Sequence, residues 1–128
     1  MTFKKQEIEA RLDARAAKRR ATPLAPLQAV DALKQAAADL EDLCAELERL
    51  GLEARVSGAT GSTLVFQVPK EPSVPGEPKD VSRFECVNNR IEVETGIKDR
   101  RVIDSTVDAI VTEVEGMIRG WLALRLRQ

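Results

Sequence analysis

The sequence predicts an α+β domain with two N-terminal helices, a four-stranded antiparallel meander, and a long C-terminal amphipathic helix packed on the sheet. Three observations lead to this fold class. Apolar residues recur at steps of three and four over residues 27–50, alternate with polar residues between 52 and 95, and return to steps of three and four from residue 103. The first and last patterns are typical of helices that bury one face, and the alternation is typical of half-buried strands.

Residues 2–21 are expected to form a helix because Ala, Arg, Lys, Glu and Gln predominate there. The apolar pattern of this segment is thin, since only Ile8, Leu12 and Ala16 recur at four-residue steps. Residues 1–21 hold seven basic and three acidic residues, so the segment is strongly basic. A helix with so little to bury docks weakly or needs a partner. We therefore separate residues 1–21, as a peripheral basic helix, from an α+β core domain over residues 22–128.

A second helix over residues 27–50 has the clearer signal. Pro23 and Pro26 end the preceding helix, because proline cannot continue it. The apolar stripe of the second helix consists of Leu33, Ala36, Leu40, Leu43, Leu47 and Leu50. Residues 27–51 hold six acidic and two basic residues, so this helix carries the opposite charge to the first. Gly51 is the expected stop, because glycine readily adopts the left-handed conformation that ends many helices.

The alternating region predicts two hairpins. The four strands are expected near residues 52–56, 64–68, 81–87 and 90–95. The second hairpin turns at Asn88-Asn89, because asparagine tolerates the left-handed conformation that a two-residue turn requires. Residues 70–79 contain three prolines. We interpret them as a stiff connector between the hairpins, with a docking segment as the alternative.

The last helix is expected over residues 100–127, with Asp99 as its N-cap. Its large apolar residues keep a coiled-coil-like spacing at Ile103, Val107, Ile110, Val114, Met117, Trp121 and Leu124. A sheet of four short strands covers only part of a helix this long, so its C-terminal half should expose an apolar patch. A symmetric homodimer would cover this patch. The expected interface residues are Gly116, Met117, Gly120, Trp121, Leu122 and Leu124.

Small residues share another side of the same helix. They are Ser105, Ala109, Thr112, Gly116, Gly120 and Ala123. Glycine within a helix is less favourable than alanine by about 1 kcal/mol, so two of them call for a packing reason. One interpretation is a close contact with a neighbouring helix. The alternative is an exposed side on which small residues have accumulated without a role.

A basic stripe on the first helix offers a second candidate binding surface. It consists of Lys4, Arg11, Arg15, Lys18 and Arg19. Such a stripe could contact nucleic-acid phosphates or an acidic partner protein. Against nucleic acid, no aromatic residue interrupts it and the calculated pI is 5.6. The favoured interpretation is a face that is solvated or paired with the protein's own acidic helix.

The composition argues against the commonest forms of catalysis. Histidine is absent, which excludes Ser-His-Asp and Cys-His nucleophile systems and removes a leading metal ligand. Glu92 and Glu94 share one face of a strand, with Glu85 across from them. We interpret these acids as the solvent-facing side of the sheet rather than as a cation site.

Two further motifs have simple structural interpretations. Residues 57–63 contain two glycines but no following lysine, which favours a hairpin turn over a phosphate loop. Cys44 and Cys86 are read as small core hydrophobes. We therefore expect no enzyme activity, no cofactor and no bound metal.

The function predicted from these features is a non-catalytic protein–protein interaction module: an adaptor, chaperone-like cofactor or inhibitor of another bacterial protein, acting as a homodimer. The alternative is a dimeric nucleic-acid-associated protein that uses the basic first helix. A carboxylate- or metal-dependent enzyme comes third. No apolar run reaches the ~20 residues of a membrane span, so we expect a cytoplasmic protein without a membrane partner.

Overall fold

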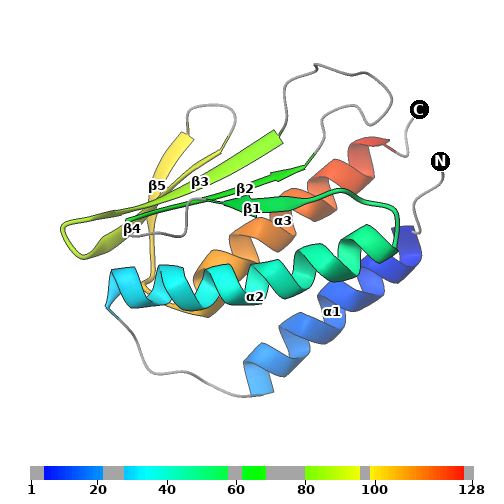
Figure 1. Cartoon of the computed structure of the whole chain (residues 1–128), viewed down its shortest axis with the longest axis horizontal. Coiled ribbons are helices and arrows are strands. Elements are labelled where there is room, and N and C mark those ends of the chain that lie inside the picture. The colour runs from blue at the N-terminus through cyan, green and yellow to red at the C-terminus, as the bar shows by residue number, and fades with distance from the viewer. Residues whose placement is uncertain (1–4, 22–27, 58–61, 69–79, 96–98, 126–128) are drawn as a thin grey trace.

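The computed structural model describes residues 5–21, 28–57, 62–68, 80–95 and 99–125 (Figure 1). Three helices lie on one side of a five-stranded antiparallel sheet within this part of the chain. The helices are α1 (Lys5–Ala21), α2 (Ala29–Arg49) and α3 (Val107–Arg125). The strands are β1 (Arg55–Ser57), β2 (Thr63–Val68), β3 (Asp80–Val87), β4 (Arg90–Thr95) and β5 (Asp99–Ile103). The predicted α+β class is confirmed.

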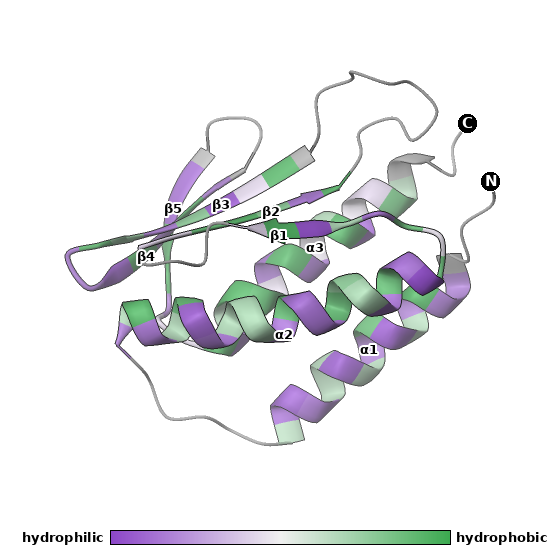
Figure 2. Ribbon diagram, in the orientation of Figure 1, coloured by the Kyte–Doolittle hydropathy of each residue, from purple (hydrophilic) through white to green (hydrophobic). Residues whose placement is uncertain are grey.

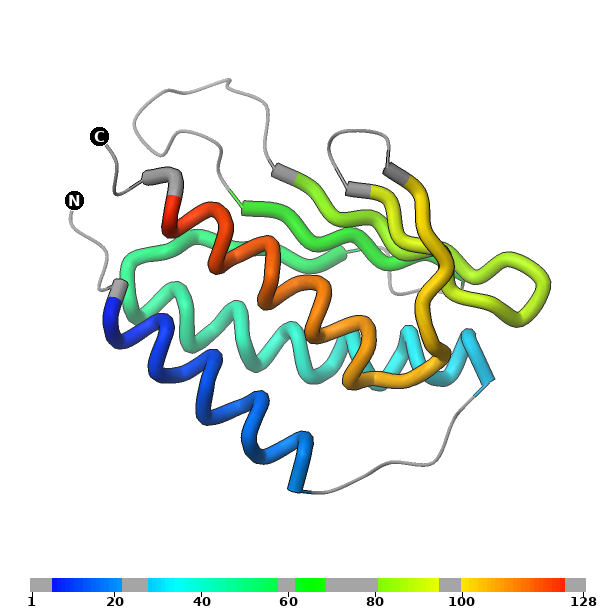
Figure 3. Tube along the Cα trace, turned by 180° about the vertical axis from the view of Figure 1, so that it is seen from behind, coloured from blue at the N-terminus to red at the C-terminus, as the bar shows by residue number. Residues whose placement is uncertain are grey.

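The elements form layers. The strands follow one another in the order β1-β2-β3-β4-β5, each antiparallel to the next, so the sheet is a simple meander. α2 and α3 lie against the sheet, and α1 lies beyond them on the side away from the strands (Figures 1 and 3). α1 therefore lies in an outer layer, with α2 and α3 between it and the sheet.

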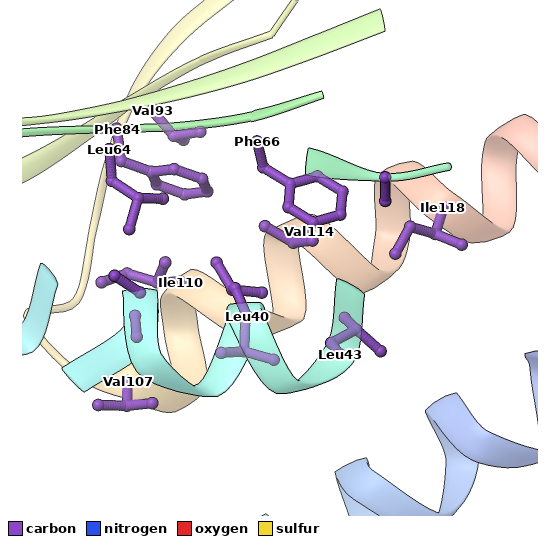
Figure 4. Close-up of a cluster of buried hydrophobic side chains, with 14 of the residues drawn as sticks. Leu40, Leu43, Leu64, Phe66, Phe84, Val93, Val107, Ile110, Val114 and Ile118 are labelled. Atoms are coloured by element: carbon purple, nitrogen blue, oxygen red, sulfur yellow. The ribbon is translucent and has the colours of Figure 1, made fainter. Parts of the chain in front are cut away.

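The core lies between the sheet and the two inner helices (Figure 4). Phe66 and Phe84 are fully buried and face α2 and α3. The alternation predicted for β2 is confirmed, because Leu64, Phe66 and Val68 are buried while the residues between them are partly exposed. One face of the sheet is thus covered by α2 and α3. The opposite face carries the residues that alternate with the buried ones along each strand.

The sheet has five strands rather than the four predicted. Asp99–Ile103 pairs with β4, with Ile103 opposite Ile91 and Arg100 opposite Glu94. The sequence assigned these residues to the last helix, with Asp99 as N-cap, and both assignments are wrong. Ile103 fits the helical series and the strand alternation equally well. Pairing with the open edge of β4 satisfies backbone groups that would otherwise lack partners, and this decides in favour of the strand.

α3 consequently begins later than predicted. Thr106 is its N-cap, because its Oγ1 accepts a hydrogen bond of 3.1 Å from the backbone N–H of Ala109, the third helical residue. The helix has 19 residues and is about 28 Å long. It is therefore shorter than the sequence suggested, while the sheet that covers it has one more strand.

The predicted hairpin turn and the predicted end of the second helix are both confirmed. Asn88 and Asn89 have φ angles of 52° and 58°, the left-handed values that a two-residue hairpin turn requires. Gly51 follows the end of α2 with φ 94°. Both signals are local, since each depends on the conformational freedom of one or two residues.

The hairpin turn also caps α2. The Oδ1 of Asn89 accepts a hydrogen bond of 3.1 Å from the backbone N–H of Ala29, the first residue of the helix. Gln28, at the N-cap position, makes no side-chain capping bond. A residue 60 positions away in the sequence therefore supplies the cap that the helix lacks locally.

We expect Asn89→Gly to lower the free energy of unfolding by about 1 kcal/mol, the usual loss on removing a helix cap. Glycine keeps the positive φ of the turn, so the change removes the capping oxygen and little else. Asn88→Gly is the matched control, because it alters the same turn and leaves the cap in place. Urea denaturation of both variants measures the difference. Equal stabilities would contradict the capping role.

Candidate interaction surface

The arginines of the predicted basic stripe lead to the first candidate surface. Arg15 reaches α2, where its guanidinium donates hydrogen bonds of 2.9 Å to the carbonyl and Oδ1 of Asp39. The same side chain lies 3.3 Å from Glu46 Oε2. The side chain of Arg15 is 18% exposed, so these contacts hold it between the two helices rather than in solvent.

Arg19 makes the more buried set of contacts. Its two terminal nitrogens donate to the carboxylate of Glu115 on α3 at 2.8 and 2.6 Å, and its Nε donates to Asp108 at 2.9 Å. Glu115 is only 4% exposed, so this is a charge pair inside the protein. Burial alone would lower the pKa of Arg19, but the hydrogen bonds that Arg19 donates to Glu115 and Asp108 outweigh it and raise the pKa. Arg19 therefore stays charged and joins α1 to α3.

The structure divides the predicted basic stripe. Arg15 and Arg19 face carboxylates of α2 and α3, whereas Arg11 and Lys18 are exposed. Lys4 lies outside the described residues. A third contact, 2.7 Å between Arg119 and Asp13, ties α1 to α3 at the surface. The sequence suggested α2 as the acidic counterpart of the stripe and missed the acids of α3.

A signal for Glu115 was present in the sequence. It lies four residues after Val111 and three before Ile118, at the edge of the buried face of α3. A charged residue at such a position needs a partner when the edge is covered. The partner, Arg19, is 96 residues away, so no local pattern could have identified it.

Several residues of the predicted dimer interface are buried within a single chain rather than exposed on its surface. Trp121 is 3% exposed and Leu122 is fully buried, so both belong to the core of a single chain. Met117 is partly buried, and its sulfur accepts a hydrogen bond of 3.0 Å from the Oγ of buried Ser82. The side chain of Leu124 lies outside the described residues. The expected apolar patch around Trp121 is wrong, because this residue is buried within a single chain. The helix is shorter and the sheet has one more strand than the expectation assumed.

Gly116 and Gly120, by contrast, lie on the open side of α3. Both are exposed, and a Cβ added to either would find no atom of the described residues within 4 Å. Together with their small neighbours they form what we call the α3 strip: Ala109, Thr112, Gly116, Gly120 and Ala123. Ser105, which the sequence placed in this series, precedes the first residue of α3.

Two hollows flank the α3 strip. The first, of about 300 Å³, lies between α1 and α3 and is lined by Ala16, Thr112 and Gly116, with Arg20 and Arg119 also in its wall. The second, of about 420 Å³, lies between β5 and α3. It includes Val102, which is 58% exposed and is the one large hydrophobic residue exposed in the described part of the chain. Thr112 lines both hollows, so they meet at the N-terminal half of the strip, while Gly120 and Ala123 line neither of them.

The acids on the outer face of the sheet share one basic partner within the sheet. Glu85 lies opposite Glu92 in the strand register, as predicted from their alternation. Arg100 of β5 contacts Glu85, Glu92 and Glu94, and its pKa is raised mainly by the hydrogen bond with Glu92. The sequence could not assign this role to Arg100 because it placed the residue in a helix. Among the residues that the structure describes, no cluster of three or more acids and cysteines is arranged to hold a metal ion.

Both cysteines are free thiols that lie at the edge of the core. Burial, with a smaller contribution from Glu41, raises the pKa of the Cys44 thiol to about 11. The protonated thiol is a poor nucleophile. Cys44 therefore contributes to packing at neutral pH, as the sequence suggested.

No helix in the described residues combines the length and apolar character needed to cross a membrane. No protein-family model, curated protein or solved structure matches the chain.

Proposed function

We propose that this protein is a non-catalytic interaction module that binds a second protein chain, in the first instance another copy of itself, through the α3 strip. The observation that carries the proposal is the pair Gly116 and Gly120, which are exposed in the middle of a helix. Each makes α3 less stable by about 1 kcal/mol than alanine would. Among the residues that the structure describes, no close neighbour requires a glycine at either position.

The surroundings of the strip fit a helix-sized partner. Small residues allow two helix axes to approach to about 8 Å, the short end of the usual range. The hollows on both sides give room for the side chains of an approaching element. Exposed Val102 adds an apolar contact at one edge, and Arg20 adds a basic group at the other. Within this proposal the protein acts as an adaptor, a chaperone-like cofactor or an inhibitor of its partner.

A nucleic-acid role for α1 has less support than the sequence suggested. Arg15 and Arg19, two of the five stripe residues, are engaged with carboxylates of α2 and α3. Arg11, Lys18 and Arg20 remain outward, too few described bases for a long phosphate track. We therefore keep protein binding as the proposed function.

The α3 strip is tested with two kinds of substitution. Gly116→Ala with Gly120→Ala should raise the free energy of unfolding of the monomer by about 2 kcal/mol, because alanine favours the helix and meets open space. Gly120→Leu should weaken self-association by about tenfold or more, because it fills the strip. Urea denaturation measures the first effect, and sedimentation equilibrium measures the second.

The control for added bulk is Ala45→Leu, at an exposed position of α2 away from the strip. This variant should associate as the wild type does. A wild-type protein that remains monomeric throughout the micromolar range would refute self-association. Equal association of Gly120→Leu and the control would refute the assignment to the strip.

A further inference from the structure

α1 buries far fewer residues against the rest of the protein than α2 does. Among residues 6–21 of α1, only Ile8 and Leu12 are fully buried. α2 buries eight residues. Figure 2 shows α1 as mostly hydrophilic along its length. α1 is therefore held by a small apolar contact and by its ion pairs.

The surface beneath α1 is acidic at its edges. We call it the α1 seat and define its charged residues as Asp39 and Glu46 on α2, and Asp108 and Glu115 on α3. Arg15 contacts the first pair and Arg19 the second. The seat thus complements a basic helix by charge and, at Ile8 and Leu12, by apolar packing.

The four residues of α1 that fill the seat follow a simple pattern. Ile8, Leu12, Arg15 and Arg19 are spaced by four, three and four residues, which places them on one face of a helix. The specific contacts therefore require an apolar residue, a second one four positions later, and arginines three and seven positions after that. Any helix with this pattern presents the same groups to the seat.

From these contacts we infer that the α1 seat is a binding site for a basic amphipathic helix of another protein, and that α1 occupies it as a built-in competitor. The seat adjoins the α3 strip, because Asp108 and Glu115 line the first hollow together with Thr112 and Gly116. The inference goes beyond the proposed function because it assigns a different contact, the one that α1 occupies within the chain. A tethered helix competes at an effective concentration in the millimolar range. A partner helix therefore binds when it is pre-organised, or when the ion pairs of α1 are weakened.

The test uses the full-length chain and, as probe, a fluorescent peptide of residues 5–21. In the variant Arg15→Gln with Arg19→Gln, the chain's own α1 loses its ion pairs, and the peptide should replace it. The peptide is expected to bind this variant at least about tenfold more tightly than the wild type, measured by fluorescence anisotropy. A peptide carrying the same two glutamines should not bind. Adding Glu115→Gln to the chain should weaken binding of the original peptide.

The matched control is Arg11→Gln with Lys18→Gln, which removes two exposed charges of α1 outside the seat. It should bind the peptide as weakly as the wild type. We call the variant Arg15→Gln with Arg19→Gln the opened variant. The inference would be overturned if the opened variant bound the original peptide and the glutamine peptide with equal affinity, or if it folded and bound neither. Unchanged association of Gly120→Leu would refute the α3 strip and leave this inference untouched, so the two proposals fail separately.

Hydrogen exchange of the wild-type protein decides the case if the opened variant does not fold. The amides of α1 should exchange faster than those of α2 and α3, through a local opening. Their exchange should accelerate as NaCl rises from about 50 mM to about 500 mM, because salt screens the ion pairs. Protection of α1 equal to that of α2 at both salt concentrations would refute a displaceable helix.

Discussion

Trp121→Asp is expected to unfold the protein. Trp121 is 3% exposed in a single chain, so the substitution removes the largest side chain of this part of the core and buries a carboxylate in its place. Loss of a buried tryptophan side chain alone lowers stability by about 3–5 kcal/mol, and an unpaired charge adds to this. The sum is comparable to the whole stability of a typical domain, about 5–15 kcal/mol.

Circular dichroism at low temperature measures the outcome directly. Trp121→Phe is the matched control and should remain folded, because phenylalanine fills most of the same space; the expected loss is about 1–2 kcal/mol. The result distinguishes a tryptophan in the core of one chain from a tryptophan at a contact between two chains. A folded, monomeric Trp121→Asp variant would place the tryptophan at a surface contact between copies, as the sequence suggested, and would contradict its burial.

Arg19→Ala is expected to lower the free energy of unfolding by about 3 kcal/mol. The substitution leaves the carboxylate of Glu115 without its bidentate partner at a position that is 4% exposed. Removing one member of a buried ion pair is typically that costly because the remaining charge is not compensated. Part of the loss should appear as release of α1, since undocking returns Glu115 to water.

Arg20→Ala is the control, because Arg20 is exposed and adjacent in sequence. Its effect should stay within about 0.5 kcal/mol, as for other surface changes. The double variant Arg19→Met with Glu115→Leu should recover much of the lost stability, since apolar residues of similar volume often replace a buried pair without loss. Urea midpoints at constant m-value give all three numbers. Equal stability of Arg19→Ala and Arg20→Ala would show that the pair does not hold α1.

Much of the fold could be predicted from the sequence because its signals are local. The leucine spacing of α2 and the alternation of β2 each depend on a few neighbouring residues, and both are confirmed. The turn at Asn88-Asn89 follows from the tolerance of asparagine for positive φ. Each signal acts within one element, so it does not depend on how the elements are later assembled.

β5 shows where local patterns stop being sufficient. Its residues support a helix or a strand, and the open edge of β4 decides between them. That edge exists only once the first four strands have paired. Because the sequence pattern assigned these residues to the last helix, it placed the start of that helix too early and made the helix too long. The expected apolar patch around Trp121 followed from that length.

The candidate surfaces could be predicted from the sequence less well than the fold, because they depend on tertiary structure. The sequence by itself determined the fold class, the meander, the lack of histidine, and the presence of a basic helix before an acidic one. Only the tertiary structure decided that Trp121 is in the core, that Arg19 meets a carboxylate 96 residues away, and that the glycines of α3 face open space. The physical reason is that burial and charge pairing are sums over neighbours from several elements, whereas periodicity is a property of one element alone.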